Sequence, residues 1–529
     1  MFNHFMKFRI SLSLVTFFVA VIIQGQFTNV QLNLPAYIDP EEVSIAINPK
    51  DANQLAGGAN LNYFYSSKDG GSVWSQMRMS STLGVWGDPC VVYDTEGNLY
   101  FAHLSNPQQG YWIDRIVVQK SSDNGITWNN GSGIGFNYPK EQDKEWLAVD
   151  HSGSQYRNNI YMSWTEFDNY GTSNPSDSSR ILFSRSTDAG DIWSAPVRLS
   201  DHGGNCIDSD ETVEGAVPAV GPSGEVYVAW AGPKGIMFDK SLDGGVTFGK
   251  DIFVDPMPTG WDMDVPGINR CNGMPITACD ISRSQYRGNV YVLWADQRNG
   301  SSNTDIFFKK SIDGGESWSD VKKVNDDVSE RHQFFPWMAV DSTNGNIYAV
   351  FYDRRNTSGV ETDVYLARSI DGGETFSNHK ISNSSFIPDA SIFFGDYTNI
   401  AAYMGIIRPI WMRMDNRILS VLTALINDKD LVVSVKEGKY IPAAFELKQN
   451  YPNPFNPSTT ISFSLPANSF VTLEVFNAIG EKIQTLFEGN KNAGVHEVNF
   501  NPENLSSGVY YYKLTTGNFV EFNKMVLAK

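Results

Sequence analysis

A short turn motif recurs along most of the chain. The pattern Ser-x-Asp-x-Gly-x-x-(Trp/Phe) occurs six times, in copies that begin at Ser67, Ser121, Ser186, Ser241, Ser311 and Ser369. In a tight turn the Asp side chain accepts backbone N–H bonds and Gly supplies a positive φ, while the closing aromatic ring buries a large apolar face. Each copy follows an alternating stretch, so we expect six hairpin turns between strands. The predicted structural aspartates are Asp69, Asp123, Asp188, Asp243, Asp313 and Asp371.

A longer repeat underlies these turns. Each unit opens with an apolar strand, passes through a turn and returns along a second strand rich in aromatics, as in 88–94 and 99–102. The units open at Val43, Asp88, Trp146, Ala216, Met274, Phe335 and Asp396. Four strands per unit, repeated radially, predict an all-β fold, a β-propeller. Seven openings favour seven blades, whereas the six turn motifs alone would give six. The alternating segment 27–34 is the candidate for the closing strand, because an open ring leaves edge strands exposed.

Together the two repeats resemble the Asp-box, or BNR, repeats of sialidases and related β-propellers. The resemblance covers residues 26–438 and implies action on extracellular carbohydrate, with hydrolysis of a glycosidic bond in the manner of an exo-sialidase. The alternative is a non-catalytic propeller that binds a glycan, glycoprotein or other protein at the cell surface. Catalytic sialidases carry an Arg-Ile-Pro near the start of the propeller, and this chain has none there; its Arg408-Pro409 lies in the last unit. Whether the chain is an enzyme is therefore open at this point.

A second domain is expected over residues 439–529. A Pro- and Asn-rich stretch, 447–457, precedes six short alternating segments, which are enough for a small antiparallel β-sandwich. The Tyr-Pro-Asn-Pro-Phe-Asn-Pro run, Phe476–Gly480 and the terminal 524–529 resemble the C-terminal sorting domain of type IX secretion substrates. This resemblance implies the type IX secretion machinery as a partner and export through the periplasm and outer membrane. Release or attachment at the surface follows, usually with the domain cleaved off.

The N-terminus, charge and cysteines agree with export. Lys7 and Arg9 precede an apolar run over 10–23, which is typical of a signal peptide and predicts one over 1–25. The net charge of −18 excludes wholesale nucleic-acid binding, because phosphate contacts need a basic face. We expect a secreted or cell-surface monomer. Outside the cytoplasm disulfides persist, and we expect a bridge between Cys206 and Cys271, each in a loop just before a repeat begins.

Polar residues at strand ends predict where chemistry could take place. In a propeller, residues before the first strand and after the second strand of each blade gather at one mouth of the channel. There one carboxyl group can protonate a leaving oxygen while a second group attacks or activates water, and arginines can hold a sugar carboxylate in bidentate pairs. The resemblance to sialidases adds a Tyr nucleophile beside an acid, as Tyr352 with Asp353 or Tyr397 with Asp396. The predicted catalytic residues are Asp353, Tyr352, Asp296 and Glu145, and the predicted substrate-binding residues are Arg298, Arg354, Arg355 and Arg413.

Two features have structural alternatives. Asp-x-Arg recurs in successive units, at Asp296–Arg298 and Asp353–Arg355, which favours a blade-to-blade ion pair or turn-locking hydrogen bonds over catalysis. The acidic loop 201–214 offers oxygen ligands that suit Ca²⁺, but it lacks EF-hand spacing, so a solvated loop is the alternative. We expect no cofactor, with Ca²⁺ as the one candidate ion.

Overall fold

The computed structural model describes residues 27–34, 40–431, 444–502, 505–517 and 519–528. The chain divides into two units, one ending at Leu431 and the other beginning at Val432. The expected signal peptide over 1–25 lies outside the described residues, and so does the expected domain boundary at 438/439. Within the described ranges, no helix is long and apolar enough to cross a membrane.

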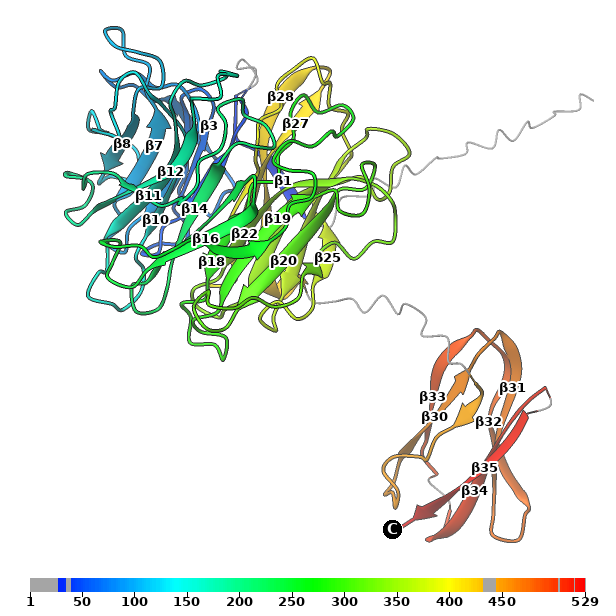
Figure 1. Cartoon of the computed structure of the whole chain (residues 1–529). Coiled ribbons are helices and arrows are strands. Elements are labelled where there is room, and N and C mark those ends of the chain that lie inside the picture. Colours follow the sequence, from blue (N-terminus) through cyan, green and yellow to red (C-terminus); the bar gives the residue numbers. More distant parts are fainter. Residues whose placement is uncertain (1–26, 35–39, 432–443, 503–504, 518, 529) are drawn as a thin grey trace, which may run out of the picture. The chain divides into compact units, whose positions relative to one another are not determined.

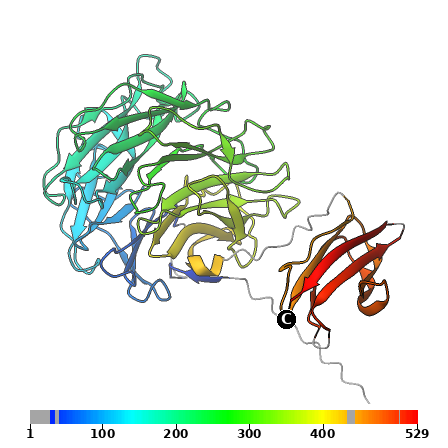
Figure 2. The same cartoon turned by 90° about the horizontal axis from the view of Figure 1, so that it is seen from below.

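The first unit is a β-propeller. Its described residues form seven four-stranded antiparallel sheets, which confirms the all-β prediction and the choice of seven blades (Figures 1 and 2). The strands of blades 1 to 3 are β2 (Ser44–Ile47), β3 (Leu55–Ala59), β4 (Tyr63–Ser67), β5 (Ser75–Arg78), β6 (Cys90–Tyr93), β7 (Leu99–Leu104), β8 (Ile116–Ser121), β9 (Ser132–Ile134), β10 (Glu141–Val149), β11 (Ile160–Phe167), β12 (Ser179–Ser186) and β13 (Val197–Arg198).

Blades 4 to 7 continue in the same order. Their strands are β14 (Glu214–Val220), β15 (Val226–Gly232), β16 (Gly235–Ser241), β17 (Ile252–Asp255), β18 (Ile276–Cys279), β19 (Val290–Asp296), β20 (Asp305–Ser311), β21 (Lys322–Lys323), β22 (Gln333–Val340), β23 (Ile347–Asp353), β24 (Asp363–Ser369), β25 (Ser377–Lys380), β26 (Asn399–Tyr403), β27 (Ile406–Asp415), β28 (Ile418–Asn427) and, from the N-terminal end, β1 (Thr28–Gln31). A 3₁₀ turn, η1 (Asp428–Leu431), follows blade 7.

The ring is closed by the N-terminal segment. Strand β1 is the outermost strand of blade 7 and pairs antiparallel with β28, from Thr28 opposite Leu425 to Gln31 opposite Leu422. The pairing continues beyond the strand, because Leu32 N–H donates to the Val421 carbonyl and the Asn33 side chain accepts from Val421 N–H. The outer edge of β28 is therefore covered and blade 7 reaches four strands like the other blades, as the closure argument predicts.

The repeated turn motifs connect the third and fourth strands of blades 1 to 6. In each copy the Ser hydroxyl donates to the Asp carboxylate, and that carboxylate accepts the N–H four residues later. The closing ring can reach the blade before: Trp318 meets Phe238 edge-on, with ring centroids 5.2 Å apart. Gly315 has φ of 88°, and a Cβ there would lie 2.3 Å from the Phe238 ring. The motif thus holds its own turn and packs neighbouring blades together.

A ring of small residues lines the channel. The third residue of each four-residue core of the innermost strands faces the axis, and in all blades but one it is alanine: Ala46, Val92, Ala148, Ala219, Ala278, Ala339 and Ala401. Because strand side chains alternate in direction, the flanking Ile45 and Ile47 turn into the blade core instead. These small side chains leave a cavity of about 310 Å³ in the channel.

The second unit is a β-sandwich. One sheet contains β29 (Glu446–Leu447), β30 (Thr459–Leu465) and β33 (Gly494–Phe500), and the other contains β32 (Lys482–Lys491), β31 (Ser469–Phe476), β34 (Gly508–Thr516) and β35 (Phe519–Leu527). Inward-facing Phe463, Leu473 and Leu514 belong to one core. The Tyr512 hydroxyl donates to Lys448 O and accepts from Asn450 N–H, both at 2.7 Å, which ties the Pro- and Asn-rich stretch to the sandwich.

Closure predicts a stability effect at Asn33. In Asn33→Ala the Val421 N–H loses its acceptor in a buried position, and we expect the free energy of unfolding of the full chain to fall by about 1–3 kcal/mol. Urea denaturation measures this loss. Asn53→Ala, at an exposed asparagine, is the matched control. Equal midpoints for the two variants would contradict a role for Asn33 in closing the ring.

Candidate active site at the channel mouth

Three charged residues enter the channel mouth at equivalent places in blades 1 to 3. Glu42, Asp88 and Lys144 each lie four residues before the small channel-lining residue, and their φ angles are 50°, 51° and 54°. Non-glycine residues adopt this left-handed conformation only at a cost. The turn breaks the strand alternation, as the register shift between Asp143 and Trp146 shows. All three side chains therefore line one cavity of about 250 Å³.

An ion network crosses the mouth from blade to blade. Lys144 Nζ forms an ion pair with Asp396, which precedes the first strand of blade 7, and lies 3.7 Å from both Glu42 Oε1 and Asp88 Oδ2. Arg270, in the loop before blade 5, donates through Nε to Asp396 Oδ1 at 2.9 Å and also pairs with Asp208. Two cations thus share one fully buried carboxylate.

Burial and this network set the protonation states. Burial alone raises the pKa of Asp396, but Lys144 and Arg270 outweigh it and hold that pKa well below its ordinary range. Burial lowers the pKa of Lys144, yet Asp396 and Asp88 raise it well above the usual value, so Lys144 is charged. Burial is the main cause that raises the pKa of Asp143. Lys144 lowers this pKa, Asp88 and Asp208 raise it, and the result is a pKa of about 7. Burial, with Asp88, also raises the pKa of Glu42.

Aromatic and apolar side chains form the rest of this cavity. Trp86, Trp112, Tyr170 and Phe393 line it together with Leu61, Leu104 and Ile113. Trp86 and Trp112 are 38% and 42% exposed, so they stand at its rim. Acidic groups beside open aromatic faces in a concave site are the usual composition of a binding or catalytic pocket.

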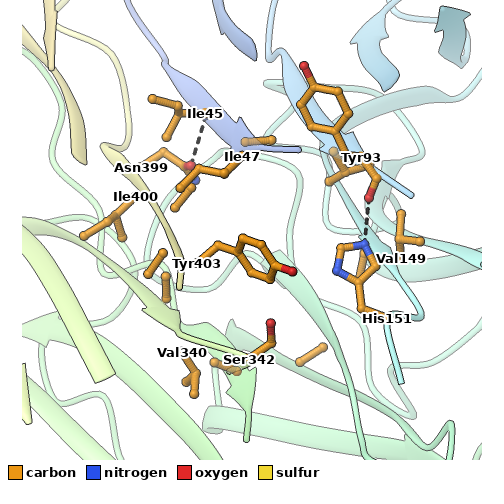
Figure 3. Close-up of a pocket in the computed structure, with 18 of the residues that line it drawn as sticks. Ile45, Ile47, Tyr93, Val149, His151, Val340, Ser342, Asn399, Ile400 and Tyr403 are labelled. Carbon is orange, nitrogen blue, oxygen red and sulfur yellow. Dashed lines mark hydrogen bonds between the residues drawn. The ribbon is translucent and has the colours of Figure 1, made fainter. Parts of the chain in front are cut away.

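The channel beyond this cavity is closed by aromatic rings. Trp146 follows Lys144 by two residues on β10, and Trp337 lies on β22; their ring centroids are 4.2 Å apart. The Tyr397 ring meets Trp146 edge-on, with centroids 5.5 Å apart. Past them lies the 310 Å³ cavity of the alanine ring. In Figure 3 the Tyr403 ring, the His151 ring and the Ser342 hydroxyl face its interior, and His151 Nε2 is 2.7 Å from Tyr93 O. Its described lining contains no carboxylate, so it lacks a pair of carboxyl groups like the one at the channel mouth.

The predicted Asp-x-Arg residues pair locally instead of lining the cavity. Arg355 Nε lies 2.8 Å from Asp353 Oδ2, and Arg298 Nε lies 2.9 Å from Asp296 Oδ1. The same arrangement recurs in blade 7, where Arg413 pairs with Asp415. Arg298 and Arg355 also reach Asp255 and Asp326, respectively. The ion-pair alternative therefore describes how these side chains lie.

The remaining predicted site residues are buried in other surroundings. The Tyr352 hydroxyl donates to Met412 O at 2.8 Å and accepts from Met412 N–H, and burial raises its pKa well above the usual value. Arg354 donates to Pro266 O and Thr362 Oγ1, and burial lowers its pKa to about 10. Glu145 lies near Asp88 and Asp143, but it is buried with neither oxygen hydrogen-bonded, and burial raises its pKa well above normal.

Sequence reasoning missed Glu42, Asp143, Lys144 and Arg270 as members of the cavity. For Glu42 and Lys144 a signal existed: aligning the blades on the channel-lining alanine places both in the column of Asp88. Arg270 and the rim tryptophans come from loops, where no periodicity marks them.

The cysteine prediction was wrong. All four cysteines are free and buried in the structure. Cys206 and Cys271 lie in different loops, and each is fixed there by its own backbone: the Cys206 carbonyl accepts from Gly171 N–H, and the Cys271 carbonyl accepts from Met263 N–H. Each cysteine is therefore held by backbone hydrogen bonds and not by a bond to the other cysteine.

Three of the acids of loop 201–214 have protein partners. Asp201 pairs with Lys250, Asp208 pairs with Arg270, and Asp210 accepts from Asp262 N–H. Across the described ranges, no three His, Cys, Asp or Glu side chains gather in a way that could hold a metal ion. Ca²⁺ binding by this loop stays a prediction.

The ion network predicts a pH-dependent loss of stability in Lys144→Met. Removing the cation leaves Asp396, Asp88 and Glu42 with one counter-charge fewer in a buried site, at a cost of about 3–5 kcal/mol near neutral pH. Because the pKa of Asp396 is depressed in the folded state, its contribution exists above the unfolded pKa and disappears as pH falls below about 4. The difference between wild type and variant should therefore shrink in acid. Urea denaturation across pH tests this, with exposed Lys68→Met as control; a pH-independent difference would argue against the ion pair.

Comparison with known proteins identifies the second unit. Residues 449–528 match the family described as the secretion system C-terminal sorting domain. This match confirms the predicted resemblance of the C-terminal unit and indicates export to the cell surface or the extracellular space. No curated protein matches the chain.

Solved structures resemble the chain at low identity. An α-L-arabinofuranosidase from Fusarium graminearum in complex with an iminosugar inhibitor shares 13% identity over 76% of this chain and 98% of that chain, with a TM-score of 0.42. An ulvan lyase shares 12% over 76% and 96%, with a TM-score of 0.45. The NanB sialidase from Streptococcus pneumoniae shares 10% over 72% and 82%, with a TM-score of 0.43. At these values the likeness bears on no activity of this chain.

Proposed function

We propose that the cavity at the channel mouth binds and hydrolyses a glycoside outside the cell. One observation carries this proposal: Asp143, a carboxyl group whose pKa is raised to about 7, lines an aromatic cavity beside the second carboxyl group of Asp88. A group that titrates near neutral pH is suited to donate a proton, and a pair of carboxyl groups is what most glycoside hydrolysis requires.

Each residue then has a defined role. Asp143 protonates the leaving glycosidic oxygen, and Asp88 attacks the sugar or activates a water molecule. Lys144, 3.7 Å from Asp88 Oδ2, supports the negative charge of Asp88 while Asp143 stays protonated. Trp86 and Trp112 offer ring faces to the apolar face of a sugar. Asp396 acts through Lys144 and Arg270 and is a positioning residue.

The charge of the cavity favours a neutral sugar over sialic acid. Its lining carries the carboxyl groups of Glu41, Glu42, Asp88 and Asp143 against the cations Lys144 and Arg270. Both cations are already occupied by Asp396, and Arg270 also by Asp208. Since Arg298, Arg355 and Arg413 pair with their own aspartates, none of them is placed to clamp a sugar carboxylate.

Non-catalytic glycan binding is the second candidate, and the exposed tryptophans at the rim favour it. A hydrolysis screen separates the two. The full chain would be tested with aryl glycosides of glucose, galactose, xylose, arabinose, rhamnose and N-acetylglucosamine, and with an aryl sialoside. Turnover of a neutral glycoside supports the enzyme; turnover of none leaves a binding propeller.

The sorting domain gives the proposal its setting. We propose that the type IX secretion machinery recognises the β-sandwich that contains residues 449–528. The propeller then reaches glycans at the cell surface or in the medium.

Removing the proton donor should affect substrates according to their leaving group. Asp143→Asn is expected to lower kcat/KM by about 10²–10⁴-fold on an alkyl glycoside, whose leaving oxygen must be protonated. A 2,4-dinitrophenyl glycoside departs without a proton, so its turnover should change far less. Asp320→Asn, at an exposed carboxyl group, is the control. An equal loss on both substrates would show that Asp143 is not the acid.

The pH profile should report the same carboxyl group. Because the protonated form of Asp143 acts and its pKa is about 7, kcat/KM is expected to fall as pH rises above 7, approaching tenfold per pH unit. In Asp143→Asn this alkaline fall should disappear. A profile that keeps its alkaline limb in the variant would assign the proton to another group.

A further inference from the structure

Five aromatic rings stand exposed beside the cavity. Trp86, Tyr111, Trp112, Phe136 and Tyr138 are between 38% and 55% exposed. They come from the three loops that connect β5 to β6, β7 to β8 and β9 to β10. Each of these loops either leads into a first strand or follows a second strand, so all three lie at the mouth of the channel. We call these five rings the aromatic shelf.

The aromatic shelf is continuous with the cavity. Trp86 and Trp112 line the cavity itself, and Tyr111 is the neighbour of Trp112 in the same loop. Tyr111 and Tyr138 stack with ring centroids 4.1 Å apart and planes 28° apart, which joins the second loop to the third. The shelf therefore extends outward from the cavity rather than forming a separate patch.

Hydrogen bonds, an ion pair and ring contacts hold the loops of the aromatic shelf in place. Ile113 N–H donates to Ser105 O, and Gln142 N–H at the start of β10 donates to Ile113 O at 2.8 Å. The Ser105 hydroxyl donates to Asp114, which also pairs with Arg115, and the Arg115 guanidinium lies 4.3 Å from the centroid of the Phe136 ring. Trp112 meets Tyr170 edge-on at 5.7 Å. Rings held in place before binding lose little conformational entropy when a ligand arrives.

The volume of the cavity limits how much of a ligand can lie inside it. At about 250 Å³ it is smaller than the roughly 300–1,000 Å³ of pockets that enclose a drug-sized ligand, so it holds a sugar unit but not a chain. Further sugar units must lie outside it, and the shelf is the adjoining surface. The apolar C–H face of a pyranose suits the electron-rich face of an aromatic ring.

We propose that the aromatic shelf binds the continuation of a neutral polysaccharide whose reacting unit occupies the cavity. The substrate class is then a glycan chain rather than a single terminal sugar. This inference rests on the proposed function for the position of the reacting bond, but binding by the shelf can be measured without turnover.

The test uses the full chain and two variants. Affinity gel electrophoresis would be run in gels that contain barley β-glucan, xylan, arabinan or galactan. We expect wild type to be retarded in at least one, and Tyr111→Ala/Tyr138→Ala to bind it about tenfold or more weakly, because the variant loses two ring faces. Phe253→Ala, which removes a 52% exposed ring in the outer strand of blade 4, should bind like wild type.

Kinetics separate this inference from the proposed function. For each substrate, kcat/KM of the double variant is divided by kcat/KM of wild type. This ratio should be about tenfold lower on the polysaccharide that retards the protein than on an aryl monosaccharide glycoside. Retardation that the double variant loses, without turnover of any substrate, would refute the hydrolase and leave the shelf. Turnover of an aryl glycoside without retardation in any of the four gels would refute the shelf and leave the hydrolase. Wild-type binding to deglycosylated mucin as strong as to intact mucin would indicate a protein partner and overturn the inference.

Discussion

The buried carboxylate of Asp396 determines the arrangement of the channel mouth. Burying a carboxylate away from water costs several kcal/mol of folding free energy unless cations and hydrogen-bond donors surround it. Here Lys144 of blade 3 and Arg270 of the loop before blade 5 both pair with Asp396. Arg270 fixes its loop across the mouth, and Trp261 of that loop covers blade 4 so closely that a Cβ on Gly215 would lie 2.6 Å from the ring. The opening is therefore left on the side of blades 1 to 3. The same network that stabilises the mouth decides where a ligand can enter.

The fold was predictable because its signals are local and repeated. A turn such as 311–318 contains its own hydrogen bonds and glycine conformation, so six copies with strands between them indicate a radial repeat. Strand β1 could be predicted from its alternation and from the cost of an open edge. The absence of a Cys206–Cys271 bridge could not be predicted, because a disulfide depends on the distance between two loops, and nothing in the spacing of the cysteines records that distance.

The cavity proposed as the site lies at the predicted mouth of the channel, but mostly different residues line it. The starts of the first strands do gather at the mouth, and they include Asp88 and Asp396, which the sequence placed where two of the repeat units open. In blade 3, however, the position just before the first strand suggested Glu145, whereas the left-handed conformation at position 144 turns Lys144 to the cavity and leaves Glu145 buried. A one-residue shift exchanges the two faces of a strand, and a bulge that causes it is invisible in a hydrophobic pattern. Arg270, Trp86 and Trp112 depend on loop conformation, for which the sequence holds no comparable period.

The arginines explain how a sialidase-like sequence can carry a different specificity. Arg298, Arg355 and Arg413 lie near the ends of second strands, which makes them resemble an anion clamp in the sequence, yet each is neutralised by an aspartate two residues away. A paired guanidinium would have to break that pair before it could bind a sugar carboxylate, and its donors are already satisfied. The lining of the mouth therefore combines carboxyl groups and aromatic rings with two cations that are already paired. In a propeller the local charges at the mouth determine which ligand can bind, and here they agree with the neutral sugar proposed above.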